Sequence, residues 1–175
     1  MKTKQAILGA LLGLLILGAA AAPVSAGVYV YASDGRYFRA EGPAQYWHYD
    51  YNEGYCGKFG KWCSPASFRW TYSMDPLHST NYAVWKIEPA QQYFSRAYAF
   101  IPCKDATALA FYGIGYAGAS VYKSRINQLS FCNQWVQLNS GALYLIGSVD
   151  LSDNNEWFGA SGRYRVAFDE IKIEN

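Results

Sequence analysis

The sequence predicts an all-β protein: a two-sheet antiparallel β-sandwich, jelly-roll-like, preceded by a cleaved signal peptide. Short segments rich in Tyr, Phe, Trp, Val and Ile alternate with clusters of Gly, Asn, Asp, Ser and Pro along most of the 175 residues. No segment of the mature chain keeps a helical period of apolar residues over three turns. About eleven short strands in one compact domain favour two packed sheets.

The first 26 residues are expected to be a secretion signal. Lys2 and Lys4 precede an apolar run at 6–22, and Val24-Ser25-Ala26 has the small-x-small pattern that signal peptidase recognises. No later apolar run approaches the ~20 residues that span a bilayer. We therefore expect a secreted, extracellular protein without a membrane anchor.

Turn-forming residues divide the rest of the chain into eleven expected strands. The first three, at 28–32, 37–40 and 44–49, are separated by Ser33-Asp34-Gly35 and Gly42-Pro43. The next three lie at 67–72, 82–87 and 94–101, and the last five at 109–116, 120–126, 135–139, 143–151 and 164–173. Residues 27–175 should form one domain, with an aromatic-rich part at 27–66 that carries a disulfide loop and a sandwich core at 67–175.

Alternation supports these strands and locates one irregularity. In the segment 94–101, large rings occupy one side of the strand and small Ser and Ala residues the other. In the last segment the apolar residues change phase between Phe168 and Ile171. A regular strand would then turn apolar side chains to water, so we expect a bulge or kink near Asp169 and Glu170.

Aromatic residues are the most informative part of the composition. The chain contains 6 Trp, 16 Tyr and 9 Phe, all beyond residue 26, which is more than a core of this size can bury. Tyr and Trp combine an apolar face with a polar tip, so the surplus indicates a binding surface. The mature chain has thirteen basic and thirteen acidic residues, and this zero net charge argues against a nucleic-acid partner.

Four cysteines in an exported chain indicate two disulfides. Three pairings are possible, and we favour Cys56 with Cys63 and Cys103 with Cys132. Their spacings match no zinc pattern.

Six motifs in order resemble a known family. They are Phe68-Arg69-Trp70-Thr71-Tyr72, Ala83-Val84-Trp85-Lys86, Tyr98-Ala99-Phe100-Ile101-Pro102, Asn127-Gln128 with Trp135-Val136-Gln137-Leu138, Val149-Asp150-Leu151-Ser152-Asp153 and Val166-Ala167-Phe168-Asp169-Glu170-Ile171. Across 67–175 the chain is similar to the golvesin C-terminal domain family, which includes the carbohydrate-binding-domain-like module of xanthan lyase. This resemblance implies a β-sandwich module that is attached to secreted enzymes or surface proteins and binds glycans.

The segment 46–55 supplies most of the candidate ligand-binding residues, because rings there alternate with hydrogen-bonding groups. The full candidate set is Trp47, Tyr49, Asp50, Tyr51, Asn52, Tyr55, Trp62 and Trp135. An equally weighted alternative is that the rings of the segment only cover an open end of the sandwich. Trp85 and Trp135 lie in strand patterns that favour the core, and Trp135, next to a turn, is the better candidate for the surface.

Asp153 and Asp169 are candidate ligands for a structural Ca²⁺. The alternative is that both carboxylates accept hydrogen bonds from backbone amides at a turn and at the expected bulge. We expect no other cofactor. No nucleophile motif accompanies His48 or His78, so we expect no enzyme activity.

Three functions are compatible with the sequence. The first is a secreted, non-catalytic module that recognises extracellular polysaccharide or cell-wall glycan by aromatic stacking. The second is a self-associating matrix, coat or filament subunit, favoured by zero net charge and exposed rings. The third is a lyase or hydrolase acting on acidic polysaccharide, which only the resemblance suggests.

Overall fold

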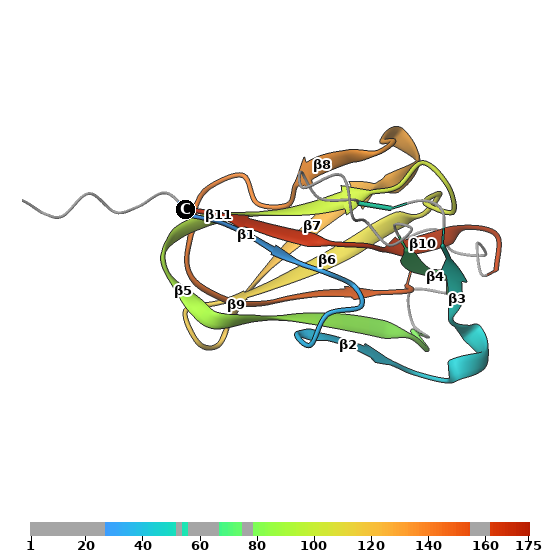
Figure 1. Ribbon diagram of the computed structural model, residues 1–175, viewed down its shortest axis with the longest axis horizontal. Helices are drawn as coiled ribbons and strands as arrows, with labels where there is room; N and C mark the ends of the chain where they lie inside the picture. Colours follow the sequence, from blue (N-terminus) through green and yellow to red (C-terminus); the bar gives the residue numbers. More distant parts are fainter. Residues whose placement is uncertain (1–26, 52–53, 56–66, 75–78, 155–161) are drawn as a thin grey trace, which may run out of the picture.

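Eleven β-strands and two single-turn 3-10 helices form the computed structural model, which describes residues 27–51, 54–55, 67–74, 79–154 and 162–175 (Figure 1). The strands are β1 Val28–Tyr31, β2 Phe38–Glu41, β3 His48–Asp50, β4 Phe68–Tyr72, β5 Tyr82–Ile101, β6 Leu109–Tyr116, β7 Ser120–Asn127, β8 Gln134–Gln137, β9 Leu143–Ser152, β10 Arg165–Phe168 and β11 Ile171–Glu174, and the 3-10 helices are η1 Ala44–Tyr46 and η2 Gln128–Ser130. The named strands pair antiparallel, which confirms the all-β sandwich.

Strand β5 connects the two halves of the larger sheet, whose order is β1-β11-β5-β9-β6-β7. The first residues of β5 pair with β2 and β9, and its last residues pair with β11 and β8. The register against β9 shifts after Lys86 and again before Phe94, and Figure 1 shows β5 curving back there. The strands expected at 82–87 and 94–101 are therefore one strand of 20 residues.

A smaller sheet has the order β10-β4-β3. Residues Asp169 and Glu170 separate β10, which pairs with β4, from β11, which pairs with β1 and β5. The expected strand 164–173 is therefore two strands in two sheets. The change of apolar phase at this point lets both strands present apolar residues to the same core.

Alternate strand residues build one hydrophobic core. In β5, Ala83, Trp85 and Ile87 are almost completely buried, whereas Tyr82 and Lys86 are exposed. Trp85, only 1% exposed, is a core residue rather than a sugar platform. Among the described residues, no helix is long and apolar enough to cross a membrane.

The strand expected at 44–49 is wrong in its first half. Pro43 accepts a hydrogen bond from the amide of Tyr46, so residues 44–46 form the 3-10 turn η1 and pairing begins only at His48. The disulfide Cys103–Cys132 is present. Cys56, Cys63 and the expected signal peptide lie outside the described residues.

Candidate functional site

A pocket of about 630 Å³ lies on the outer side of β2 and the first half of β5. Because Ala83 and Trp85 point into the core, Tyr82, Val84 and Lys86 face outward into this pocket. The complete lining is Arg36, Tyr37, Phe38, Arg39, Glu41, Tyr82, Val84, Lys86 and Glu88. None of these residues was predicted as a site residue from the sequence, although the alternation in 82–87 places three of them on one outer side.

Charges of both signs line the pocket. Arg39 pairs with Glu41, and Lys86 pairs with Glu88, while the side chains of both cations stay exposed at 77% and 68%. Arg36 lies over the ring of Tyr37, 4.5 Å from its centre. The pocket thus offers cations, carboxylates and aromatic residues within one hollow, a set suited to hydroxyl groups and ring faces.

Ring contacts extend this pocket to two of the predicted binding residues. The Arg69 guanidinium lies 5.1 Å from the ring centre of Phe38, which lines the pocket, and 4.8 Å from that of Tyr49. Tyr49 in turn stacks with Tyr51, with ring centres 6.2 Å apart and planes 12° apart. Both tyrosines are well exposed, at 48% and 58%. We call the pocket together with Arg69, Tyr49 and Tyr51 the pocket surface.

Trp47 and Asp50 face other surroundings. The ring of Trp47 packs edge-on against the core residue Phe168, with centres 4.9 Å apart. Asp50 is buried and ion-paired with Lys104. Period-two alternation in β3 explains why Asp50 is separated from Tyr49, because the two residues lie on opposite sides of the strand. Asn52 and Trp62 lie outside the described residues.

Tyr55 and Trp135 come together at another place. Their ring centres are 4.8 Å apart, and both rings also pack against Phe100. The Lys172 ammonium lies 5.2 Å from the Trp135 ring centre and 4.2 Å from that of Tyr98. The described candidate residues therefore lie in separate places. Tyr49 and Tyr51 belong to the pocket surface, Trp47 packs against the core, Asp50 is buried, and Tyr55 and Trp135 form this cluster.

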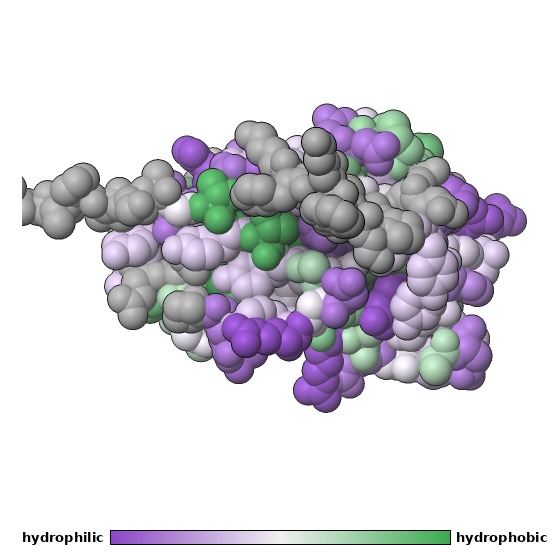
Figure 2. All heavy atoms as spheres, viewed as in Figure 1, coloured by the Kyte–Doolittle hydropathy of each residue, from purple (hydrophilic) through white to green (hydrophobic). Residues whose placement is uncertain are grey.

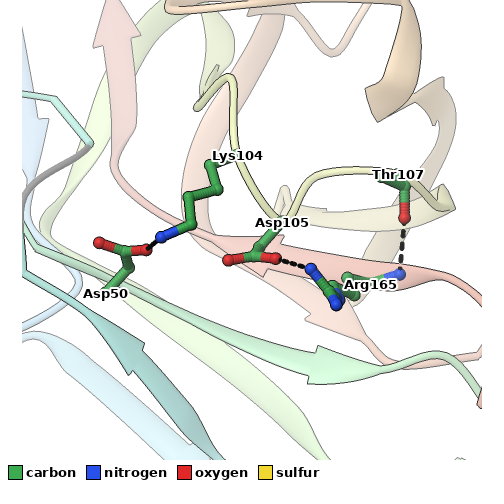
Figure 3. A network of polar contacts seen from close by, with 5 residues as sticks. All are labelled: Asp50, Lys104, Asp105, Thr107 and Arg165. Atoms are coloured by element: carbon green, nitrogen blue, oxygen red, sulfur yellow. Dashed lines mark hydrogen bonds and ion pairs between the residues drawn. The ribbon is translucent and has the colours of Figure 1, made fainter.

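A polar network anchors the loop 103–107 to the smaller sheet (Figure 3). Lys104 pairs with Asp50, Asp105 pairs with Arg165, and the amide of Arg165 donates to the Thr107 hydroxyl at 2.9 Å. The Arg165 guanidinium also lies 5.0 Å from the ring centre of Trp70. His48 stacks on that same ring at 4.1 Å. Trp70 is consequently packed between side chains and offers less open surface than Tyr49 and Tyr51.

The two candidate calcium ligands have different surroundings. Asp153 accepts hydrogen bonds from the Ser79 and Thr80 hydroxyls and from the amides of Thr80 and Asn81. Asp169 accepts one from the Tyr55 amide at 3.1 Å through Oδ2, and its buried Oδ1 has no partner. Burial raises the pKa of Asp169 well above its usual range, and the Glu170 carboxylate adds to this shift. No group of three or more His, Cys, Asp or Glu side chains within the described ranges is arranged to hold a metal ion.

Comparison with known proteins gives one structural similarity. No protein-family model and no curated protein matches the sequence. The fold is similar to part of a xanthan lyase from Paenibacillus, with a TM-score of 0.56 and 10% sequence identity. The similarity covers 83% of this chain and 13% of that one, so the chain spans a small part of that protein's length. At this identity the comparison shows a related fold, and membership of the golvesin family stays a prediction.

Proposed function

We propose that this protein is a secreted, non-catalytic module that binds extracellular polysaccharide or cell-wall glycan. The observation that carries the proposal is the pocket surface: a pocket of about 630 Å³ whose lining residue Phe38 contacts Arg69, which also lies over the ring of Tyr49 in the exposed pair Tyr49 and Tyr51. Two stacked, exposed rings beside such a hollow suit contact with a partner molecule.

The chemistry of the pocket surface suits sugars. The apolar face of a pyranose can lie against a tyrosine ring, while Arg39, Glu41, Lys86 and Glu88 can bond its hydroxyl groups. The volume falls within the roughly 300–1,000 Å³ of small-molecule sites. The related fold within a xanthan lyase supports a carbohydrate-related role.

Secretion is supported by two features. The Cys103–Cys132 disulfide fits an oxidising compartment. The first 26 residues have the charge and apolar pattern of an export signal.

Binding to insoluble glycans tests the proposal. Protein made from the full 175-residue chain is incubated with cellulose, chitin, β-1,3-glucan and peptidoglycan, and the unbound fraction is measured. We expect wild-type protein to be retained on at least one glycan. The double variant Y49A/Y51A should bind that glycan with about tenfold lower affinity, because each ring contact contributes about 0.5–1.5 kcal/mol. Tyr93→Ala removes an equally exposed ring outside the pocket surface and should bind like wild type.

Two outcomes would contradict the proposed glycan-binding function. Folded wild-type protein that is retained on none of the glycans would rule out the binding function as proposed. Release of soluble sugar from any of them would show catalysis, which we do not expect.

Self-association is the second candidate, and strand β1 favours it. At the edge of the larger sheet, β1 carries no charged residue, and Val28 and Val30 are 64% and 44% exposed. Figure 2 shows apolar surface at the position that β1 has in Figure 1. Uncharged edge strands are liable to pair with another chain. Sedimentation at micromolar concentration decides: a monomer favours glycan binding, and a concentration-dependent oligomer favours assembly.

A further inference from the structure

Beyond the pocket, the outer side of the larger sheet continues as an ordered row of residues. The register places Arg39, Val84, Asp150, Gly113 and Lys123 opposite one another on β2, β5, β9, β6 and β7. Val84 and Arg39 line the pocket, so the row leads from the pocket across the middle of the sheet. The neighbouring core residues Val149, Leu151, Tyr112 and Ile114 point to the other side, which fixes this row as outward.

The middle of this outer side is low because β6 carries glycines there. A Cβ atom on Gly113 would lie 2.5 Å from each Asp150 carboxylate oxygen, and one on Gly115 would lie 2.5 Å from the Ser148 hydroxyl oxygen. The carboxylate and the hydroxyl therefore lie against the sheet, over the glycines. They form a floor of short polar groups of β9 that lie over the glycines of β6.

Long side chains border this floor on both flanks. On β5, Tyr82 is 42% exposed and the Lys86 side chain 68% exposed. On β7, Val121 is 58% exposed, and Lys123 and Arg125 are exposed beside it. Three inter-strand spacings separate β5 from β7, roughly 14 Å, which is wide enough for a single sugar chain running along the strands.

Asp150 contacts the Gly113 backbone on this floor and has no cation beside it among the described residues. It forms no ion pair with any residue of the described ranges, and the cations of its row, Arg39 and Lys123, are each two strands away, about 10 Å. Burial raises the pKa of the Asp150 carboxyl above its usual range, and the Gly113 amide only partly opposes the shift. A half-buried carboxylate without a cation costs stability, and hydrogen bonds from ligand hydroxyl groups would offset that cost.

We infer that the floor between β5 and β7 is a second part of the glycan-binding surface, in which Asp150 accepts hydrogen bonds from the hydroxyl groups of an uncharged sugar unit. An acidic sugar is disfavoured there, because its carboxylate would meet that of Asp150. Such a unit would bind in the pocket instead, beside Arg36, Arg39 and Lys86. This inference rests on the proposed function and names the class of ligand for one part of the surface.

Binding by D150N tests the inference. The asparagine keeps the shape of the side chain and loses the charge, so affinity for uncharged cellulose, chitin or β-1,3-glucan should fall about tenfold. S148W, which fills the floor with an indole, should abolish binding to the same glycan. E174Q, on β11 in the other half of the sheet, should bind like wild type. Circular dichroism confirms that each variant is folded.

The outcomes separate this inference from the proposed function. If D150N and folded S148W bind like wild type while Y49A/Y51A loses affinity, the inference is wrong and the glycan-binding function stands. If wild type binds only polygalacturonate, an acidic glycan, and D150N binds it more tightly, the named ligand class is wrong. If wild type binds none of the glycans, both fail together.

Discussion

The side-chain amide of Gln128 pairs with the backbone of Ala167 as another strand would. Its Nε2 donates to the Ala167 carbonyl at 2.9 Å, and its Oε1 accepts from the Ala167 amide at 3.0 Å. The same Nε2 donates to the Tyr112 hydroxyl at 3.1 Å. Gln128 is completely buried. A single side chain in η2 therefore satisfies the free edge of β10 inside the protein.

Replacement of Gln128 by alanine should destabilise the protein strongly. The variant leaves the amide and carbonyl of Ala167 buried without partners, and each unsatisfied group costs about 1–3 kcal/mol. We expect the free energy of unfolding to fall by about 3 kcal/mol, measured by urea denaturation. Asn127→Ala, at the exposed neighbouring position, should change it by less than about 0.5 kcal/mol. Similar values for the two variants would show that the side-chain bridge contributes little.

Stability should decrease as the pH rises from about 5 to 7.5. Burial raises the pKa of Glu170 from 4.5 to about 7, and the Asp34 carboxylate adds to the shift. Between these values the folded state holds a proton that the unfolded state has released, so unfolding becomes easier with increasing pH. Glu170 is partly exposed, and after allowance for solvent screening we expect a loss of about 1–2 kcal/mol.

Glu170→Gln supplies the control for this pH dependence. The amide cannot ionise, so urea denaturation at pH 5 and pH 7.5 should show a smaller loss of stability than in wild type. Asp169 should account for what remains, because burial also raises its pKa. Wild-type stability that increases over this range would contradict the assignment.

Much of the fold follows from period-two alternation, and the deviations have physical reasons. The phase change between Phe168 and Ile171 correctly located an irregularity, but the sequence alone does not distinguish a bulge from a change of sheet. The strand expected to start at 44 begins at His48, because a proline-initiated 3-10 turn precedes it. No local sequence pattern predicts the role of Gln128, because its hydrogen-bond partner Ala167 is 39 residues away in the sequence.

The candidate site was only partly predictable. Local composition identified Tyr49 and Tyr51 as exposed rings, and the structure connects them through Arg69 to a pocket. The pocket itself brings together β2 and β5, which are far apart in sequence. Asp50 is buried with Lys104, a pairing that depends on a long-range contact. Composition therefore identifies candidate rings, and topology decides which of them share a surface.

Removal of the Cys103–Cys132 disulfide should lower stability without changing the fold. The bond joins residues 29 apart, and closing a loop of this length stabilises a protein by about 3.6 kcal/mol. We expect C103S/C132S to lose about 2–4 kcal/mol of unfolding free energy in urea and to keep the β-rich circular dichroism spectrum of wild type. Loss of the spectrum itself would show that the bond is required for folding rather than for stability alone.

The Asp153 carboxylate should stabilise its turn through hydrogen bonds without a metal ion. Its two oxygens accept from two hydroxyls and two amides at 2.8–3.1 Å, which uses the lone pairs that calcium would need. Asp153→Ala should therefore lower the unfolding free energy by at least about 3 kcal/mol, because each hydrogen bond to a charged group contributes about 1.5–3 kcal/mol. Calcium chloride or EGTA should shift the wild-type melting temperature by less than about 1 °C. If calcium raises the wild-type melting temperature by several degrees and this rise is absent in Asp153→Asn, the calcium site belongs to the Asp153 carboxylate. If the rise is absent only in Asp169→Asn, the calcium site belongs to the buried carboxylate of Asp169, whose Oδ1 has no hydrogen-bond partner.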